Sequence, residues 1–185
     1  ATDGLENFGG NSFDWKIVDD LFKPKIAYEL NLADFRRDNQ KYVKVFAKIK
    51  TPILKIQDKD NRIYYIDKKG DIIHGIKKAL YLPVANGHID DSIAMNEARL
   101  LATTINESKF WNSQIEQIYF DKEGKVTMIP RVGDHVIEFG KVNDVENKLE
   151  KLYTFYNEGL NRVGWNKYSK INIEFGDKVI CTKNR

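Results

Sequence analysis

Residues 164–185 read GWNKYSKINIEFGDKVICTKNR, a stretch with the pattern of a β-hairpin that ends the chain. Apolar and polar residues alternate through 170–175, which is typical of a half-buried strand. Gly176 and Asp177 follow, and glycine at the first of two loop positions suits a type II′ turn. Residues 178–183 then return as the last strand. We therefore expect this strand to form the edge of a sheet.

The register of this hairpin follows from a two-residue loop. It predicts three cross-strand pairs: Phe175 with Lys178, Ile173 with Ile180, and Ile171 with Thr182. The residues that would share the core face are Ile171, Ile173, Phe175 and Ile180. Val179 and Cys181 would then lie on the opposite face. A final strand with apolar residues on both faces suggests that something covers its outer side or adds to its free edge.

Composition and charge narrow the class of protein. The 185 residues, 42% of them hydrophobic, are enough for one large domain or for a small and a medium one. Thirty Lys and Arg are mixed with 27 Asp and Glu, and this balance disfavours nucleic-acid binding because no basic stripe forms. Apolar runs are far shorter than the roughly 20 residues that cross a bilayer. We expect a soluble piece of a longer protein, without an internal disulfide because Cys181 is the single cysteine.

The first part of the chain carries weaker signals. Residues 1–14 are rich in Gly, Asn and Asp and are expected to be frayed. Residues 15–22 and 30–37 have apolar spacings compatible with short helices. Residues 42–56 alternate like a strand, and Pro52 within them indicates an edge or a bulge.

The remaining segments predict strands and two helices. Turns at 58–61 and 67–70 flank a strand at 62–66, and 71–73 continues after the second turn. A helix over 91–108 is capped by Asp90 or Asp91. Three strands, at 114–120, 125–131 and 135–139, form an antiparallel meander. A second helix begins with Asn143 as cap and Glu146 three places on, and ends near Gly164. Its apolar stripe consists of Val145, Leu149, Leu152, Phe155, Tyr156 and Leu160. This order predicts an α+β fold with a largely antiparallel sheet.

Residues that could carry chemistry are dispersed. His74, His88 and His135 have no Cys or His at metal-ligand spacing, so we expect surface or turn histidines and no metal site. Cys181 lies within a predicted strand, where packing is favoured over a nucleophilic role. The glycines form no phosphate-binding loop, and no cofactor is expected. A pair of catalytic carboxylates cannot be recognised from sequence, so a glycosidase hypothesis stays open.

Aromatic pairs at 64–65, 110–111 and 155–156 fit core positions, with one ring of each pair inward and the other outward. Trp165 falls in the loop between helix and hairpin, three residues before Tyr168. An indole there either plugs the end of the core or anchors an interface.

Four stretches resemble the extracytoplasmic part of the bacterial cell-division family FtsQ/DivIB. They are YYIDKKGDII at 64–73, LPVANG at 82–87, RVGDHVIEFGK at 131–141 followed by a helix with Lys148 and Leu149, and NIEF at 172–175. They occur in the family's order. Glu174 departs from the pattern, because the family has a basic residue there.

The resemblance implies a fold of two parts. A small, reduced or divergent POTRA-like unit would occupy residues 1–52, and a mostly antiparallel FtsQ-type β domain with two helices would occupy 53–185. The family's membrane helix is absent here, so the piece would lie on the periplasmic or extracytoplasmic face of the cytoplasmic membrane, anchored in the full-length protein by that helix.

The resemblance also implies a noncatalytic scaffold, with no catalytic residue, cofactor or metal. The family's last strands receive a segment of FtsB, in complex with FtsL, partly by strand addition. Carried over by position, the partner-binding residues are Phe175, Lys178, Val179, Ile180, Cys181, Thr182 and Lys183, with Trp165 and Tyr168 as flanking anchors.

Two other classes stay open. A cell-envelope glycan hydrolase would need a pocket with paired Asp or Glu side chains of raised pKa. A ligand-binding α+β domain would need a large apolar cavity.

Overall fold

The computed structural model describes residues 5–8, 11–14, 28–37, 40–76, 79–176 and 178–184. The chain divides into two compact units, residues 1–50 with 75–79 and residues 51–74 with 80–185.

The described residues of the first unit form two antiparallel strand pairs. β1 (Leu5–Phe8) pairs with β2 (Asn11–Asp14), and β3 (Tyr28–Arg37) pairs with β4 (Gln40–Ile49) along its whole length. The helix predicted at 30–37 is therefore wrong, because each residue of this stretch pairs with a residue of β4. Residues 5–8 and 11–14, expected to be frayed, are also paired. The helix predicted at 15–22 lies outside the described residues.

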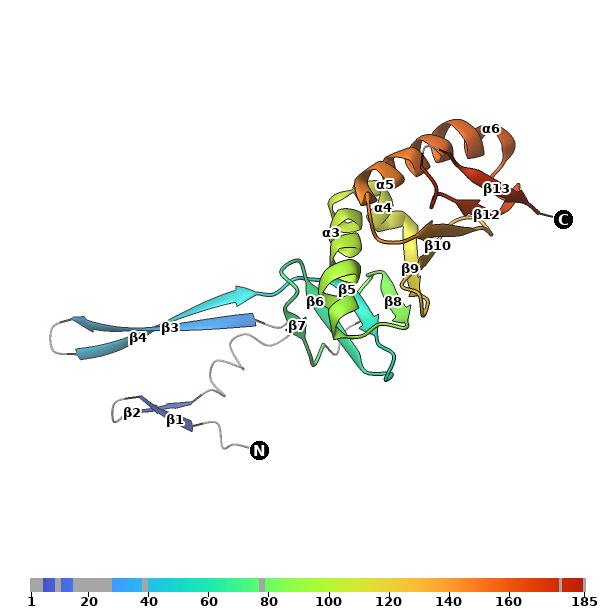
Figure 1. The fold of residues 1–185 in the computed structure, drawn as a ribbon. Helices are drawn as coiled ribbons and strands as arrows, with labels where there is room; N and C mark the ends of the chain where they lie inside the picture. The colour runs from blue at the N-terminus through green and yellow to red at the C-terminus, as the bar shows by residue number, and fades with distance from the viewer. Residues whose placement is uncertain are drawn as a thin grey trace. The chain divides into compact units, whose positions relative to one another are not determined.

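The second unit is built on a nine-stranded mixed sheet (Figure 1). Its strands are β5 (Pro52–Gln57), β6 (Ile63–Asp67), β7 (Ile72–Ile73), β8 (Val84–Gly87), β9 (Ile115–Phe120), β10 (Val126–Pro130), β11 (Val136–Gly140), β12 (Tyr168–Asn172) and β13 (Ile180–Lys183). The strand order is β13-β12-β11-β10-β9-β8-β5-β6-β7. The pairs β5–β8, β8–β9 and β11–β12 are parallel and the others antiparallel. The predicted α+β class with a mostly antiparallel sheet is confirmed.

Helices follow two of the sheet's strands. After β8 come α2 (Asp91–Ile93), the π-helical turn η1 (Ala94–Ala98), α3 (Arg99–Glu107) and α4 (Lys109–Gln114). After β11 come α5 (Val145–Thr154), the π-helical turn η2 (Phe155–Leu160) and α6 (Asn161–Val163). The predicted Asp90 cap is confirmed, since the Ile93 N–H donates to its carboxylate at 2.9 Å. The sequence did not predict α4, which starts after Ser108 in extended backbone.

The second helix begins one residue later than predicted. Asp144, in a left-handed conformation, precedes α5 and makes no side-chain cap, so the Asn143 capping prediction is wrong. The Asn143 side chain instead accepts a hydrogen bond from the Lys148 ammonium at 2.8 Å. That ammonium also donates to the carbonyls of Phe139 (3.2 Å) and Lys141 (2.9 Å). Lys148 is only 6% exposed, and burial lowers its pKa. The lysine therefore fastens the start of α5 to the end of β11.

The core lies between the helices and one face of the sheet. The buried members of the predicted α5–η2 stripe are Val145, Leu149, Leu152, Tyr156 and Leu160, with Phe155 packed at their margin. The inner rings of the three aromatic pairs, Tyr64, Trp111 and Tyr156, are also buried, as predicted. His135 corrects the expectation of surface histidines. It is 1% exposed, its Nε2 lies 2.6 Å from the Tyr156 hydroxyl, and burial lowers its pKa.

Three hairpin turns share one construction. They are Asp58–Arg62 between β5 and β6, Asp67–Asp71 between β6 and β7, and Asp121–Lys125 between β9 and β10. In each turn, one oxygen of the leading carboxylate accepts from the N–H groups two and four residues on, at 2.8 or 2.9 Å. The fourth residue (Asn61, Gly70 or Gly124) has positive φ, as a type I turn followed by a left-handed residue requires. Turn chemistry therefore fixes the register of these hairpins.

Candidate functional site

The candidate site is the end of the sheet formed by β12 and β13. Among the described strands, β13 pairs with β12 alone, so the predicted edge position is confirmed. The Ile173 N–H donates to the Glu138 carbonyl of β11 at 3.0 Å, so the backbone groups of Lys170 and Asn172 point toward β13. Their partners Thr182 and Ile180 point back toward β12. Backbone groups of successive residues in a strand point to opposite sides, so the N–H and C=O groups of Cys181 and Lys183 point to the free edge. The same alternation directs those of Val179, just before the strand, to this edge.

The register of this hairpin differs by one residue from the prediction. Ile171 pairs with Cys181 rather than with Thr182, and Asn172 pairs with Ile180. Because successive side chains alternate between faces, this slip exchanges the faces of the whole strand. Val179 and Cys181, predicted to lie away from the core, pack half-buried against it. Ile180, predicted to be in the core, is 52% exposed.

The physical reason is that unequal numbers of residues flank the predicted turn, which keeps its hydrogen bond: residues 173–175 precede it and only 178–179 follow it before the ladder begins at the Asn172–Ile180 pair. The residues 173–179 connect β12 to β13, and the Lys178 N–H donates to the Phe175 carbonyl at 3.3 Å. Ile173 is buried as predicted, but Phe175 is 58% exposed rather than on the core face. The Lys151 ammonium of α5 donates to the Gly176 carbonyl and fastens this connection to the helix. Asp177 lies outside the described residues.

Comparison with known proteins decides the family. The family model described as FtsQ/DivIB, C-terminal related matches residues 51–182, which covers the whole nine-stranded sheet up to Thr182 of β13. The chain belongs to the FtsQ/DivIB C-terminal related family. The resemblance seen in the sequence is thus confirmed, and the family implies a role in cell division. A search of curated proteins gives no match.

The two predicted flanking anchors of this FtsQ/DivIB-related domain lie at the margin of the core. The Trp165 indole packs against the Tyr156 ring, with ring centres 5.1 Å apart, and its Nε1–H donates to the Asn161 side chain at 3.1 Å. The Tyr168 ring lies 6.0 Å from that of Phe155. Both side chains are half-buried. Trp165 therefore plugs the end of the core and leaves part of its ring accessible.

The remaining predicted residues of the site differ in exposure. Lys178, Thr182 and Lys183 are exposed, and the Thr182 carbonyl accepts from the Ser169 hydroxyl at 3.4 Å. Cys181 is half-buried, and burial raises the pKa of its thiol, so the thiol stays protonated at neutral pH. The packing role predicted for this cysteine agrees with its place beside Ile171.

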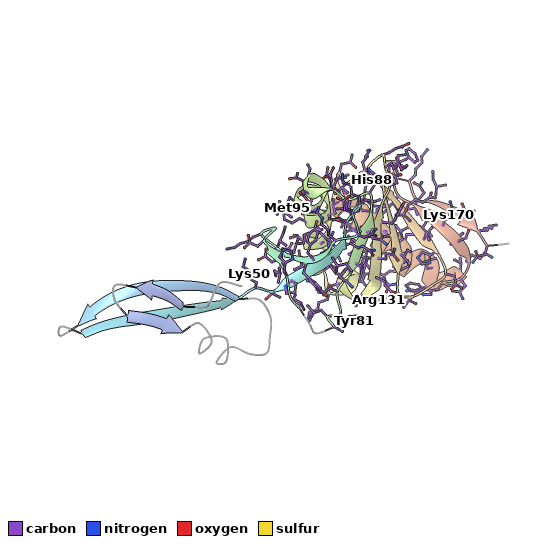
Figure 2. All side chains as sticks on the ribbon, turned by 90° about the horizontal axis from the view of Figure 1, so that it is seen from below. Lys50, Tyr81, His88, Met95, Arg131 and Lys170 are labelled. Atoms are coloured by element: carbon purple, nitrogen blue, oxygen red, sulfur yellow. The ribbon has the colours of Figure 1, made fainter. Side chains whose placement is uncertain are left out.

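A polar cluster next to this edge was missed by sequence reasoning. The Glu138 carboxylate accepts from the Lys170 ammonium at 2.9 Å and from the Asn172 amide at 3.0 Å (Lys170 is labelled in Figure 2). These two donors lower the pKa of Glu138. Glu174, the departure from the family pattern, pairs with Lys125 at 3.0 Å. The cluster could not be seen in the sequence, because it depends on the parallel pairing of β11 with β12.

The described residues hold few other candidates for chemistry. They contain no group of three His, Cys, Asp or Glu side chains that could bind a metal ion. None of their helices is long and apolar enough to span a bilayer. In this part of the chain, two carboxyl groups have a displaced pKa, Asp58 and Glu138, and in both the pKa is lowered. A carboxyl group that acts as a general acid has a raised pKa instead.

Proposed function

We propose that this chain is a noncatalytic scaffold of the division machinery that captures an FtsB-type segment, in complex with an FtsL-type protein, by strand addition to β13. One observation carries the proposal. Val179, Cys181 and Lys183 turn their backbone donors and acceptors to the outer edge of the sheet. A strand docked there pairs with these groups and extends the cover over the half-buried Val179 and Cys181.

The same proposal includes the organisation of the longer protein. Residues 1–52 form a reduced POTRA-like unit and residues 53–185 the β domain, and an N-terminal helix anchors the protein with both units on the extracytoplasmic face. The compact unit that begins at Thr51 and the family match from residue 51 support the boundary.

A backbone test separates strand addition from other contacts. The FtsB-type segment encoded by the same organism is synthesised in two forms, each N-methylated at alternate residues, and titrated into the chain by calorimetry. We expect one form to lose binding, because its methyl groups replace the donors that face β13, and the other form to bind as the unmodified segment does. Equal binding by both forms would contradict strand addition.

A variant of the protein tests the surface itself. Val179→Glu places a charge beside the docked strand, and we expect the dissociation constant to rise by about tenfold or more. The matched control is Val132→Glu, since Val132 is already 53% exposed in the β10–β11 connection. Unchanged binding by a folded Val179→Glu protein, verified by circular dichroism, shows that this surface is the wrong one.

A further inference from the structure

A second surface lies on the helical layer, in a groove between α3–α4 and α5. The groove has a volume of about 360 Å³, at the lower end of the range for ligand pockets. Its apolar part consists of Phe110, Trp111, Leu149 and Tyr153. These residues are separate from those of the β13 edge, so the groove is independent of the proposed strand addition.

The sequence around Ser108 opens the groove. Ser108 has extended backbone, which ends α3, and its hydroxyl accepts from the Trp111 N–H at 3.3 Å, which starts α4. The change of direction sends the Trp111 indole into the core and leaves the Phe110 ring half-buried. Phe110 packs edge-on against Tyr153 of α5, with ring centres 5.0 Å apart. Tyr153 is 43% exposed, so aromatic surface faces the groove.

Two carboxylates line the same groove on the α5 side. Glu146, Glu150 and Tyr153 are spaced four and three residues apart, so they lie along one face of the helix. Neither glutamate has an ion pair among the described residues. The lysines of α5 are engaged elsewhere, Lys148 with three oxygens near β11 and Lys151 with Gly176. The α5 wall of the groove therefore combines negative charge with an exposed aromatic ring.

We propose that this groove binds a helix of a partner protein that presents a bulky apolar side chain one turn away from an arginine or lysine. The apolar side chain contacts Phe110, Leu149 and Tyr153, and the cation pairs with Glu146 or Glu150. A cation beside the Tyr153 and Phe110 rings gains a further attraction from their faces. The spacing of the two glutamates matches one helical turn, so a helix lying along α5 brings its own residues to the same interval.

The test uses the whole chain, labelled with ¹⁵N, and three capped synthetic helices that differ at two positions. One carries Leu and Arg a turn apart, one Ala and Arg, and one Leu and Glu. We expect the Leu/Arg helix to shift the amide signals of residues 104–111 and 146–153 and to bind about tenfold more tightly than either of the others. The double variant Glu146→Lys with Glu150→Lys reverses the preference toward the Leu/Glu helix.

Two controls keep the test specific. Glu158→Lys makes the same charge change at an exposed site of η2 outside the groove, and Val179→Glu changes a half-buried position at the β13 edge that does not line the groove. Both leave the preference for the Leu/Arg helix intact. Equal affinity for the three helices, shifts confined to other residues, or a preference that survives the double charge reversal overturns the proposal. Self-association of the chain that protects these same amides also overturns it, because the occupant is then a second copy.

Discussion

The three Asp-led hairpins and the C-terminal hairpin of the same sheet are held in different ways. In the first group, a carboxylate at the head of the turn accepts two backbone N–H groups, and a residue with positive φ closes the loop. Among the described residues of the connection 173–179, no carboxylate accepts two backbone N–H groups in this way, and the Lys151 side chain holds the connection at Gly176. The comparison shows that turn chemistry sets the register in one part of the sheet, whereas packing against β11 and the helices sets it in the other.

The largest expected effect comes from removing the most buried of the turn carboxylates. Asp58→Ala deprives the N–H groups of Asp60 and Arg62, and the Arg62 guanidinium at 2.6 Å, of their acceptor. Asp58 is 3% exposed, so we expect the free energy of unfolding to fall by about 3 kcal/mol. Urea denaturation measures this loss.

The control for this change is Asp121→Ala. Asp121 accepts from two N–H groups in the same way but is not buried, so the expected loss is about 1 kcal/mol. Equal losses for the two variants would show that the turn hydrogen bonds, rather than burial, decide the energy.

A smaller effect is expected from lengthening the turns. One glycine inserted between Glu123 and Gly124 separates the Asp121 carboxylate from its second N–H partner and disturbs the β9–β10 register, at a cost of about 2 kcal/mol. One glycine inserted between Phe175 and Gly176 lengthens a connection that carries no such pattern, at a cost below about 0.5 kcal/mol. Thermal unfolding of the two variants measures the difference. A larger cost at the C-terminal site would reverse the comparison.

The smallest expected effect is on the loss of stability at acidic pH. Burial, the largest influence, raises the pKa of Asp58, but hydrogen bonds from Arg62 and the Asp60 amide outweigh it and leave the pKa below the ordinary value of 3.8. The unfolded chain therefore binds the proton more readily than the folded chain. The contribution of the ionised Asp58 carboxylate to stability is complete above this ordinary pKa value. It is lost as the pH falls toward the lower pKa of the folded state.

We accordingly expect the stability of Asp58→Asn to decrease less steeply than that of the wild type below about pH 4. Glu138→Gln, beside the C-terminal hairpin, should give a weaker change of the same sign, because the Glu138 side chain is partly exposed and its pairing is screened. Denaturation curves between neutral and acid pH test the ranking. An Asp58→Asn slope identical to that of the wild type would show that the Asp58 carboxylate does not cause the loss of stability in acid.

Much of the second unit could be predicted because local signals coincide there with the fold. Residues 58–61 and 67–70 were recognised as turns, and the α5–η2 stripe fell on the buried face. The strand β8 could not be predicted, since VANG is short and pairs only in parallel with distant strands. In the first unit, the spacing of residues 30–37 satisfied a helix and a strand equally, and the partner β4 decided between them.

The candidate site could be predicted in position but not in detail. The alternation of apolar residues located the final strand and its edge. The faces of Ile180 and Cys181 depended on the length of the connection, which Gly176 alone did not determine. Parallel pairing of β12 with β11 is a long-range choice, and the sequence carries no local sign of it.

The buried ammonium of Lys148 has a consequence for how this domain carries load. Three oxygens around the end of β11 hold this ammonium, so α5 cannot slide along its own axis. One face of this helix, from Glu146 to Tyr153, lines the groove, and Lys151 connects the helix to the terminal hairpin. A force applied at either surface is thus passed through α5 to the whole sheet. Because α5 keeps its position, no single element is pulled away from the domain. Occupancy of one surface should accordingly leave the affinity of the other unchanged.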